Sequence, residues 1–141
     1  MKHRLATLAD CDLLAKLNQE LIHDEGDRNP MTLPELTGRM HDWLASEYTG
    51  VLFQQGGETV AYALYWGNPH EIYLRHLYVI RNRRREGIGR QVMHILRDQI
   101  WPSDVRLTVE VLLRNTVALA FWRAMGYQDF SMKLEILPKQ P

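Results

Sequence analysis

The sequence predicts an α/β fold, a mixed central sheet with helices on both of its faces and the element order β-α-α-β-β-β-α-β-α-β. Three observations support this fold class. The chain has 141 residues, 45% hydrophobic and 24% charged, which fits one globular domain over residues 1–141. Segments with a helical spacing of apolar residues alternate with shorter segments of strand-like pattern. The chain lacks the apolar run of about 18 residues that a membrane-spanning helix needs, and its single cysteine, Cys11, excludes an internal disulfide.

The N-terminal part is expected to form a strand at residues 2–6 and then two helices. Thr7 and Asp10 have the spacing of a capping box at a helix start. Four leucines then fall on one helical face: Leu13, Leu14, Leu17 and Leu21. Thr32 and Glu35 repeat the capping-box spacing after a polar turn, so a second helix is expected to begin there.

Three strands are expected in the middle of the chain. Residues 51–53 and 60–66 are joined by a turn at Gly56-Gly57. The second of these strands is apolar on both faces, which is typical of an interior strand. Residues 72–80 form the third strand and lead into an arginine-rich segment.

The C-terminal part is expected to contain two more helices and two more strands. A helix begins near Ile88 and is closed by Pro102. Residues 105–111 alternate apolar and polar side chains, as a half-buried strand does. A last helix ends at Gly126, and residues 127–137 are predicted to form the final strand.

The formal net charge of zero hides an uneven distribution of charge. Residues 1–71 carry five Lys/Arg against eleven Asp/Glu, whereas residues 72–141 carry twelve against six. Five arginines lie within ten residues: Arg81, Arg83, Arg84, Arg85 and Arg90. Because these arginines cluster at one helix start and are not spread over a face with aromatic residues, nucleic acid is an unlikely partner.

The segment from Tyr78 to Arg90 is the most informative, because a strand runs through an Arg- and Gly-rich turn into a helix. A helix N-terminus binds anions through its unpaired N–H groups and partial positive charge. Gly87 and Gly89 allow the backbone to approach a ligand closely, and arginines supply donors suited to phosphate. A P-loop would need Gly-Lys-Ser/Thr, and a dinucleotide fingerprint would need a glycine in place of Val92. A solvated basic turn is the alternative interpretation.

Two motifs resemble those of the GNAT superfamily of N-acetyltransferases. Arg84-x-x-Gly87-x-Gly89 resembles the family's Gln/Arg-x-x-Gly-x-Gly/Ala signature, and Leu77-Tyr78-Val79 stands where the family often has Leu-x-Val. Residues 115–127 resemble the family's Asn-x-x-Ala-x-x-Leu/Phe-Tyr-x-x-x-Gly-Phe motif. The element order matches as well, so the resemblance extends over nearly the whole chain.

The resemblance implies a sheet that splays between its fourth and fifth strands, with acetyl-CoA as co-substrate in the gap. The loop at the helix start would hold the pyrophosphate, the end of the fourth strand would line the thioester, and Asn115 would bond the pantetheine arm. The residues implied to bind acetyl-CoA are Leu77, Tyr78, Val79, Arg84, Arg85, Glu86, Gly87, Ile88, Gly89, Arg90, Asn115 and Trp122.

The implied reaction is direct attack of a primary amine, on a small molecule or a peptide, on the acetyl carbonyl in a ternary complex. No acyl-enzyme forms, so Cys11 is not needed as a nucleophile. Glu110 is the candidate base, because it lies five residues before Asn115, where ribosomal-protein alanine acetyltransferases have a glutamate. The alternative is a solvated strand glutamate, and Glu71 at the head of the fourth strand is the second candidate.

One residue departs from the family pattern in a way that affects the mechanism. Trp122 occupies the position of a tyrosine that protonates the leaving thiolate in many relatives, and an indole N–H is not a useful acid. Tyr127, Tyr78 or solvent could take that role. The departure also keeps open an alternative function, a CoA- or acyl-CoA-binding sensor domain with weak catalysis.

The remaining expectations concern partners and location. The acidic segment 23–31 suits a cationic amine acceptor. A single C-terminal strand where the family has a hairpin leaves a sheet edge that a second subunit could complete, as in a homodimer. His70, Glu71 and His76 do not form a zinc motif, so no metal is expected. The N-terminus has no signal-peptide pattern, which predicts a cytoplasmic protein without a membrane partner.

Overall fold

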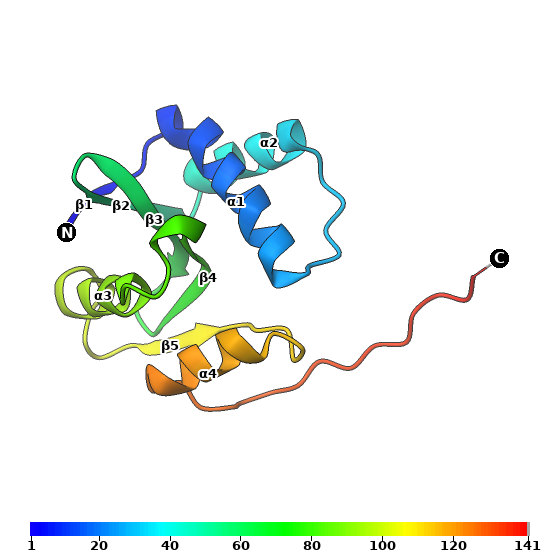
Figure 1. Ribbon diagram of the computed structural model, residues 1–141. Helices are drawn as coiled ribbons and strands as arrows, with labels where there is room; N and C mark the ends of the chain where they lie inside the picture. Colours follow the sequence, from blue (N-terminus) through cyan, green and yellow to red (C-terminus); the bar gives the residue numbers. More distant parts are fainter. Residues whose placement is uncertain (141) are drawn as a thin grey trace.

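Five strands form one mixed sheet in the computed structural model, which describes residues 1–140 (Figure 1). The strands are β1 (Lys2–Leu5), β2 (Tyr48–Gln55), β3 (Glu58–Gly67), β4 (Glu71–Val79) and β5 (Arg106–Val109). They lie in the order β1-β2-β3-β4-β5, with the first three pairings antiparallel and the β4–β5 pairing parallel.

Helices cover both faces of this sheet, which confirms the predicted α/β class. Helices α1 (Cys11–Glu25) and α2 (Leu33–Leu44) pack on one face. Helix α3 (Ile88–Ile95), continued by a π-helical turn at Leu96–Ile100, and helix α4 (Thr116–Ala124) lie on the other face (Figure 1). Short 3-10 turns at Leu8–Asp10 and Arg81–Arg83 precede α1 and α3.

Both predicted capping boxes are confirmed. The Asp10 carboxylate accepts a hydrogen bond from the Thr7 backbone N–H at 2.8 Å. The Thr32 hydroxyl accepts one from the Glu35 N–H at 3.3 Å, and the Glu35 carboxylate accepts one from the Thr32 N–H at 2.9 Å. Side chains therefore satisfy N–H groups that would otherwise be unpaired at these helix starts.

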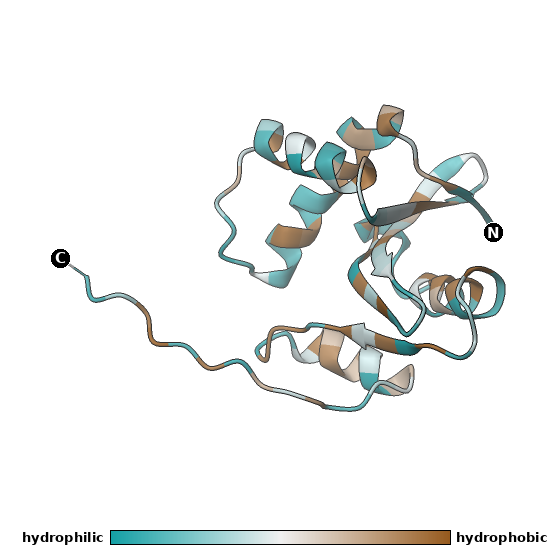
Figure 2. Ribbon diagram, turned by 180° about the vertical axis from the view of Figure 1, so that it is seen from behind, coloured by the Kyte–Doolittle hydropathy of each residue, from teal (hydrophilic) through white to brown (hydrophobic). Residues whose placement is uncertain are grey.

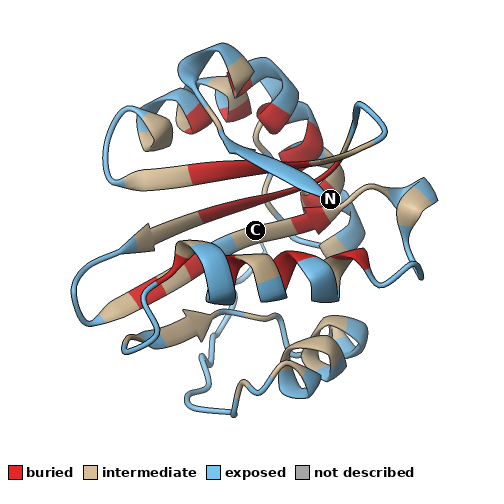
Figure 3. Ribbon diagram, turned by 90° about the vertical axis from the view of Figure 1, so that its left-hand side faces the viewer, coloured by how far each residue is buried: buried red, intermediate tan, exposed pale blue. Residues whose placement is uncertain are grey.

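Two buried clusters hold the helices on the sheet (Figure 3). On one face α1 and α2 bury Leu14, Leu17, Leu21 and Met40 against residues of β2, β3 and β4. On the other face α3 buries Ile88, Val92 and Met93, and α4 packs against the same cluster. Leu13, expected on the buried face of the first helix, is instead 38% exposed, because the buried face consists of Cys11, Leu14, Ala15, Leu17, Asn18 and Leu21, and Leu13 lies to one side of it.

The structure corrects two strand predictions in the C-terminal part. The strand predicted at 105–111 ends at Val109, so Glu110 lies just beyond it. The strand predicted at 127–137 is absent from the part of the chain that the structure describes; these residues form an extended arm without ladder hydrogen bonds that leaves the body after α4.

The sequence of this arm, residues 127–140, still has a strand-like alternation. Phe130, Met132, Leu134 and Ile136 are apolar and 65–99% exposed, and polar residues lie between them. Figure 2 shows the alternating hydrophobic and hydrophilic segments. A strand requires a partner edge as well as a pattern, and the arm pairs with no strand of this chain within residues 1–140.

None of the helices found within residues 1–140 combines the length and the hydropathy needed to cross a lipid bilayer.

Candidate active site

The loop between β4 and α3 has an unusual backbone. Arg85 has φ +65° and Gly87 has φ +75°, so two residues of a four-residue segment lie in the left-handed region. A non-glycine residue in this region costs free energy, and such residues often lie at functional sites. The space around Gly87 is open, with no atom within 4 Å of where a Cβ would lie. A glycine is therefore needed there for conformation and not for packing.

This backbone leaves a run of N–H groups free at the start of α3. The N–H of Gln91 is the first to donate to a helix carbonyl, that of Gly87. The N–H groups of residues 87–90 have no hydrogen-bond acceptor among residues 1–140, whereas that of Glu86 closes the turn at Arg84 and Arg85. Consecutive free N–H groups at a helix N-terminus form a binding site for an anion.

The charged side chains of the loop divide into paired and unpaired ones. Arg83 forms ion pairs with Glu86 at 3.1 Å and with Glu58 at 3.5 Å, so the one acid of the loop is turned toward Arg83. Arg85 and Arg90 are exposed and have no carboxylate partner in the described part of the chain. The loop therefore has an uncompensated positive charge beside its free N–H groups.

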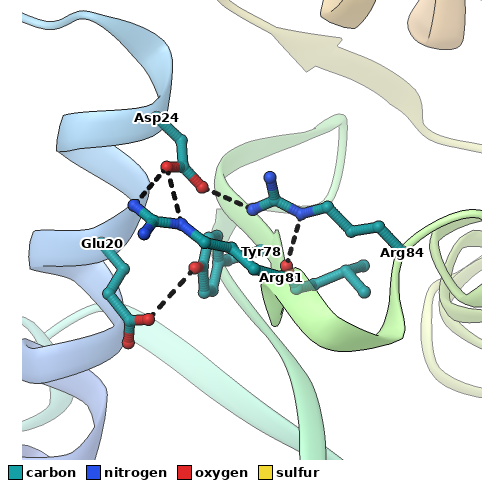
Figure 4. A network of polar contacts seen from close by, with 6 residues as sticks. Glu20, Asp24, Tyr78, Arg81 and Arg84 are labelled. Atoms are coloured by element: carbon teal, nitrogen blue, oxygen red, sulfur yellow. Dashed lines mark hydrogen bonds and ion pairs between the residues drawn. The ribbon is translucent and has the colours of Figure 1, made fainter.

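Asp24 of α1 connects the loop to the helices on the opposite face (Figure 4). Its carboxylate accepts hydrogen bonds from Arg81 and Arg84, each at 2.6 Å, and Arg84 also donates to the Val79 carbonyl at 3.0 Å. Burial favours the neutral acid, but these two guanidinium groups hold the pKa of Asp24 below its usual value. Arg84 is thus fixed to α1 rather than free at the mouth of the loop.

Gly89 has a different role from Gly87. A Cβ at Gly89 would lie 3.3 Å from Cε1 of Phe121, on α4. The absence of a side chain lets the first turn of α3 pack closely against α4. This glycine therefore sets the position of α4 relative to the loop.

The sheet separates between β4 and β5, as the resemblance implies. The parallel pairing runs from Glu71↔Arg106 to Leu74↔Val109 and then stops, although β4 continues to Val79. On its other side β4 has a bulge, because Leu74 pairs with Tyr65 and His76 pairs with Leu64, which leaves Arg75 unpaired. A bulge at this point re-aims the backbone where the two strands part.

The end of β4 borders this gap. The side chains of Leu77 and Val79 pack on the α3 and α4 side of the sheet. The buried Tyr78 side chain lies on the α1 side, where its hydroxyl donates to Glu20 at 3.4 Å (Figure 4). Tyr78 can therefore contribute its backbone, but not its ring, to the α3 and α4 side of the gap.

Two open clefts meet at Tyr73 and Glu110. One, of ≈ 1310 Å³, runs between β5, α4 and the C-terminal arm. The other, of ≈ 620 Å³, is bordered by α1, α2, β4 and the segment after β5. Burial, together with the neighbouring Glu110 carboxylate, raises the pKa of Tyr73 to about 12. Tyr73 therefore stays a hydrogen-bond donor at neutral pH.

The two carboxylates predicted as bases differ in their surroundings. Glu110 is exposed where the clefts meet and forms no ion pair with any residue in 1–140. Glu71 forms an ion pair with Arg106, its partner in the β4–β5 register. A carboxylate held by a guanidinium is less available to accept a proton, so the geometry favours Glu110.

Asn115 and Trp122 both have structural contacts. The Asn115 side chain caps α4 by accepting a hydrogen bond from the Ala118 N–H at 3.2 Å, which leaves its amide NH₂ as a donor. Trp122 packs edge-on against Phe121 and Tyr127, with ring centroids 4.9 and 5.3 Å apart, and also lines the larger cleft. Burial raises the pKa of Tyr127 to about 12, and its hydroxyl finds no partner among residues 1–140.

Sequence reasoning placed Asp24 in the acidic segment 23–31 but missed its pairing with the loop, and it assigned no role to Tyr73. Asp24 contacts Arg81 and Arg84, which are 57 and 60 positions further along the chain, and no local sequence pattern predicts such a contact. Tyr73 could have been found, because it alternates with Glu71 along β4 and its register partner is Thr108, two residues before Glu110.

Comparison with known proteins gives a consistent result. The model of the Acetyltransferase (GNAT) family matches residues 14–127. No curated protein matches the sequence closely enough to count as a relative.

Solved structures with the same fold are named as acetyltransferases. A possible acetyltransferase from Clostridium difficile 630 superposes with a TM-score of 0.79 at 16% identity, over 99% of this chain and 97% of that one. A predicted acetyltransferase with acetyl-CoA from Clostridium acetobutylicum has a TM-score of 0.76 at 18% identity, over 96% and 95%. A ribosomal-protein-alanine N-acetyltransferase from Brucella melitensis biovar Abortus 2308 has a TM-score of 0.75 at 15% identity, over 96% and 99%.

Proposed function

The chain belongs to the acetyltransferase (GNAT) family, and we propose that it moves the acetyl group of acetyl-CoA to a primary amine by direct attack in a ternary complex. The observation that carries the proposal is the run of four free N–H groups, those of residues 87–90, at the start of α3, beside the unpaired Arg85 and Arg90. A diphosphate needs such a set of donors and positive charges. We further propose that residues 1–141 act as one N-acetyltransferase domain.

The residues of this chain fit acetyl-CoA along the whole path from β4 to α4. Residues 85–90 would hold the pyrophosphate, with Arg84 beside them. The end of β4 beyond its pairing with β5, residues 77–79, would line the thioester, and the free amide NH₂ of Asn115 would donate to the pantetheine arm. Trp122 would border the arm from α4. When bound, acetyl-CoA supplies an activated acetyl thioester.

Proton transfer from the acceptor is assigned to Glu110. An alkyl ammonium has a pKa of about 10.4 and must lose a proton before it can attack. Glu110 lies where both clefts meet and its carboxylate has no cation to hold it, so it can accept that proton directly or through water. The bulge at Arg75 presents backbone N–H groups beside the strand separation, where one can donate to the carbonyl oxygen as negative charge develops.

Tyr73 is the best-placed proton donor for the leaving thiolate. Its hydroxyl stays protonated at neutral pH and lies beside Glu110. Tyr78 is directed to the α1 side of the sheet, and Tyr127 packs edge-on against Trp122 with its hydroxyl buried. A thiol with a pKa of about 8.5 leaves readily as a thiolate, so we expect the contribution of Tyr73 to the rate to be small.

The C-terminal arm supports the proposal of a homodimer. Its alternating apolar residues have no partner strand within residues 1–140, and β5 has an open edge because only β4 pairs with it. We propose that the arm of one protomer pairs with the β5 edge of a second copy. Burying four exposed apolar side chains at about 1.5–3 kcal/mol each favours that exchange. The cytoplasmic location stays a prediction.

Two measurements test the function. Acetyl-CoA is expected to raise the melting temperature, and a double Arg85→Ala/Arg90→Ala variant is expected to lose that shift. A double Lys2→Ala/Lys16→Ala variant removes two exposed charges away from the loop and is expected to keep it. An unchanged melting temperature of the wild-type protein at saturating acetyl-CoA would contradict the proposal. Release of free CoA thiol in the presence of amines separates an enzyme from the alternative, a CoA-binding sensor domain.

A further inference from the structure

Two arginines of the smaller cleft lie over the same indole ring. The guanidinium carbons of Arg39, on α2, and Arg75, at the bulge of β4, are 4.3 and 4.7 Å from the centroid of Trp43. Neither forms an ion pair with a carboxylate among residues 1–140. Burial, and then the positive charge of Arg75, lower the pKa of Arg39. The Asp27 carboxylate partly offsets this by raising the pKa of Arg39, but it does not pair with it, so the fold brings two like charges together without an ion pair.

The same place has buried donors without acceptors. Asn18 is fully buried and lines the cleft; its amide oxygen accepts from Arg39 at 3.0 Å, but its Nδ2 has no partner among the described residues. The Nε of Arg39 is likewise buried without a partner there. Buried polar groups are normally hydrogen-bonded, and each one left unpaired costs about 1–3 kcal/mol. Both unmatched groups are donors, so the missing partner is an acceptor.

The lining of the same cleft also includes carboxylates. Glu25, Asp27 and Glu110 line it, and none of them forms an ion pair with a residue in the described range. Burial, and then the charges of Asp27 and Asp24, raise the pKa of Glu25. This carboxyl would gain from a nearby cation. The cleft thus presents two arginines without ion-pair partners, Arg39 and Arg75, together with carboxylates that include Glu110.

We propose that the acceptor of the reaction is an amine that also carries an oxyanion, a carboxylate or a phosphoryl group, bound by Arg39, Arg75 and the Nδ2 of Asn18. The ammonium group lies beside Glu110, which receives its proton. This inference rests on the proposed function and names the substrate class for it. Polyamines are disfavoured, because a second cation would lie against two unpaired arginines.

Matched acceptors test the oxyanion directly. β-Alanine, 2-aminoethylphosphonate and β-alaninamide place a carboxylate, a phosphonate and a neutral amide at similar distances from a primary amine. Glycine, 4-aminobutyrate and their amides extend the series in length. Charge-assisted hydrogen bonds are expected to favour the best oxyanion over its amide by about ten- to hundredfold in kcat/KM, measured by thiol release. The ratio of carboxylate to phosphonate identifies which oxyanion the cleft prefers.

Variants assign the preference to these residues. Arg75→Gln, at an exposed strand position, and Arg39→Gln are each expected to reduce the preference to below about threefold while keeping the melting shift with acetyl-CoA. Arg28→Gln is the matched control, because Arg28 lines the same cleft but is paired with Glu135 at 2.8 Å. It is expected to leave the ratio unchanged.

Calorimetry separates failure of this inference from failure of the proposed function. The same probes are titrated into the CoA-bound protein, so binding is read without turnover. Tighter binding of the oxyanion than of its amide supports the inference even where no thiol is released. Equal binding and equal turnover of acid and amide, or a preference for spermidine in the wild-type protein, overturns it.

Discussion

Replacement of Gly87 by alanine tests whether the left-handed backbone of the β4–α3 loop creates the acetyl-CoA site. Gly87 has φ +75° and open space around its Cα, so an added methyl group meets no atom. The cost of Gly87→Ala is therefore conformational alone, about 1–2 kcal/mol for an L-residue in the left-handed region. The surrounding loop residues are exposed and little restrained by packing. We expect the loop to relax toward negative φ and the free N–H groups to diverge.

The size of the effect follows from that conformational cost. Binding of acetyl-CoA must restore the left-handed conformation, so its affinity is expected to fall by up to the same about 1–2 kcal/mol, roughly five- to thirtyfold. Isothermal titration calorimetry measures the affinity, and denaturant unfolding measures any share of the cost that appears as lost stability.

Gly57→Ala is the matched control. Gly57 has φ +79° in the β2–β3 turn, also with no atom within 4 Å of a new Cβ. This turn contacts the loop only through side chains, such as Glu58 with Arg83 at 3.5 Å, and supplies none of the free N–H groups. The variant has the same conformational cost and is expected to bind acetyl-CoA as the wild-type protein does. An unchanged affinity in Gly87→Ala, or an equal loss in both variants, would refute the assignment of the loop as the anion site.

Three other predictions follow from the structure. Glu110→Gln is expected to lower kcat by about 10²–10⁴-fold without changing acetyl-CoA affinity; an unchanged kcat removes Glu110 from the mechanism. The Arg4 guanidinium lowers the pKa of Asp10 to about 2. The ionised Asp10 therefore stabilises the fold by about 1–2 kcal/mol after screening; this contribution is present above about pH 4 and is lost as the pH falls toward 2. In urea titrations the Asp10→Asn variant should lose this dependence of the unfolding free energy on acid pH. Leu134→Asp is expected to shift the protein from dimer to monomer in sedimentation, whereas Glu135→Gln is not; a wild-type monomer contradicts the arm exchange.

Local patterns in the sequence predicted most of the fold. The capping box at Thr32 and Glu35 and the turn at Gly56-Gly57 depend on residues at most three positions apart, so their geometry follows from spacing. The β4–α3 loop was predictable for the same reason, because its strand, its glycines and its helix start follow one another in the sequence. The strand predicted at 127–137 failed for the opposite reason: alternation fixes which side chains share a face, but pairing depends on an edge elsewhere in the molecule.

The parts of the site that sequence reasoning missed depend on long-range contacts. Asp24 reaches Arg84 across 60 positions, and Arg39 meets Arg75 only because Trp43 of α2 lies where both guanidinium groups can contact its ring. The acidic segment 23–31 predicted a cationic acceptor, and the structure adds two arginines without ion-pair partners to the same cleft. No spacing rule relates these residues.

The pairing of arginines separates those that support the fold from those available to ligands. Among residues 1–140, seven arginines form ion pairs with carboxylates, and Arg97 and Arg114 donate to backbone carbonyls. The remaining four are Arg39, Arg75, Arg85 and Arg90. They form two groups, one at the free N–H groups of α3 and one in the smaller cleft, with Glu110 bordering the cleft. A transferase that joins a diphosphate-bearing donor to an oxyanion-bearing acceptor needs unpaired positive charge at two separate places, and the fold leaves it at those two.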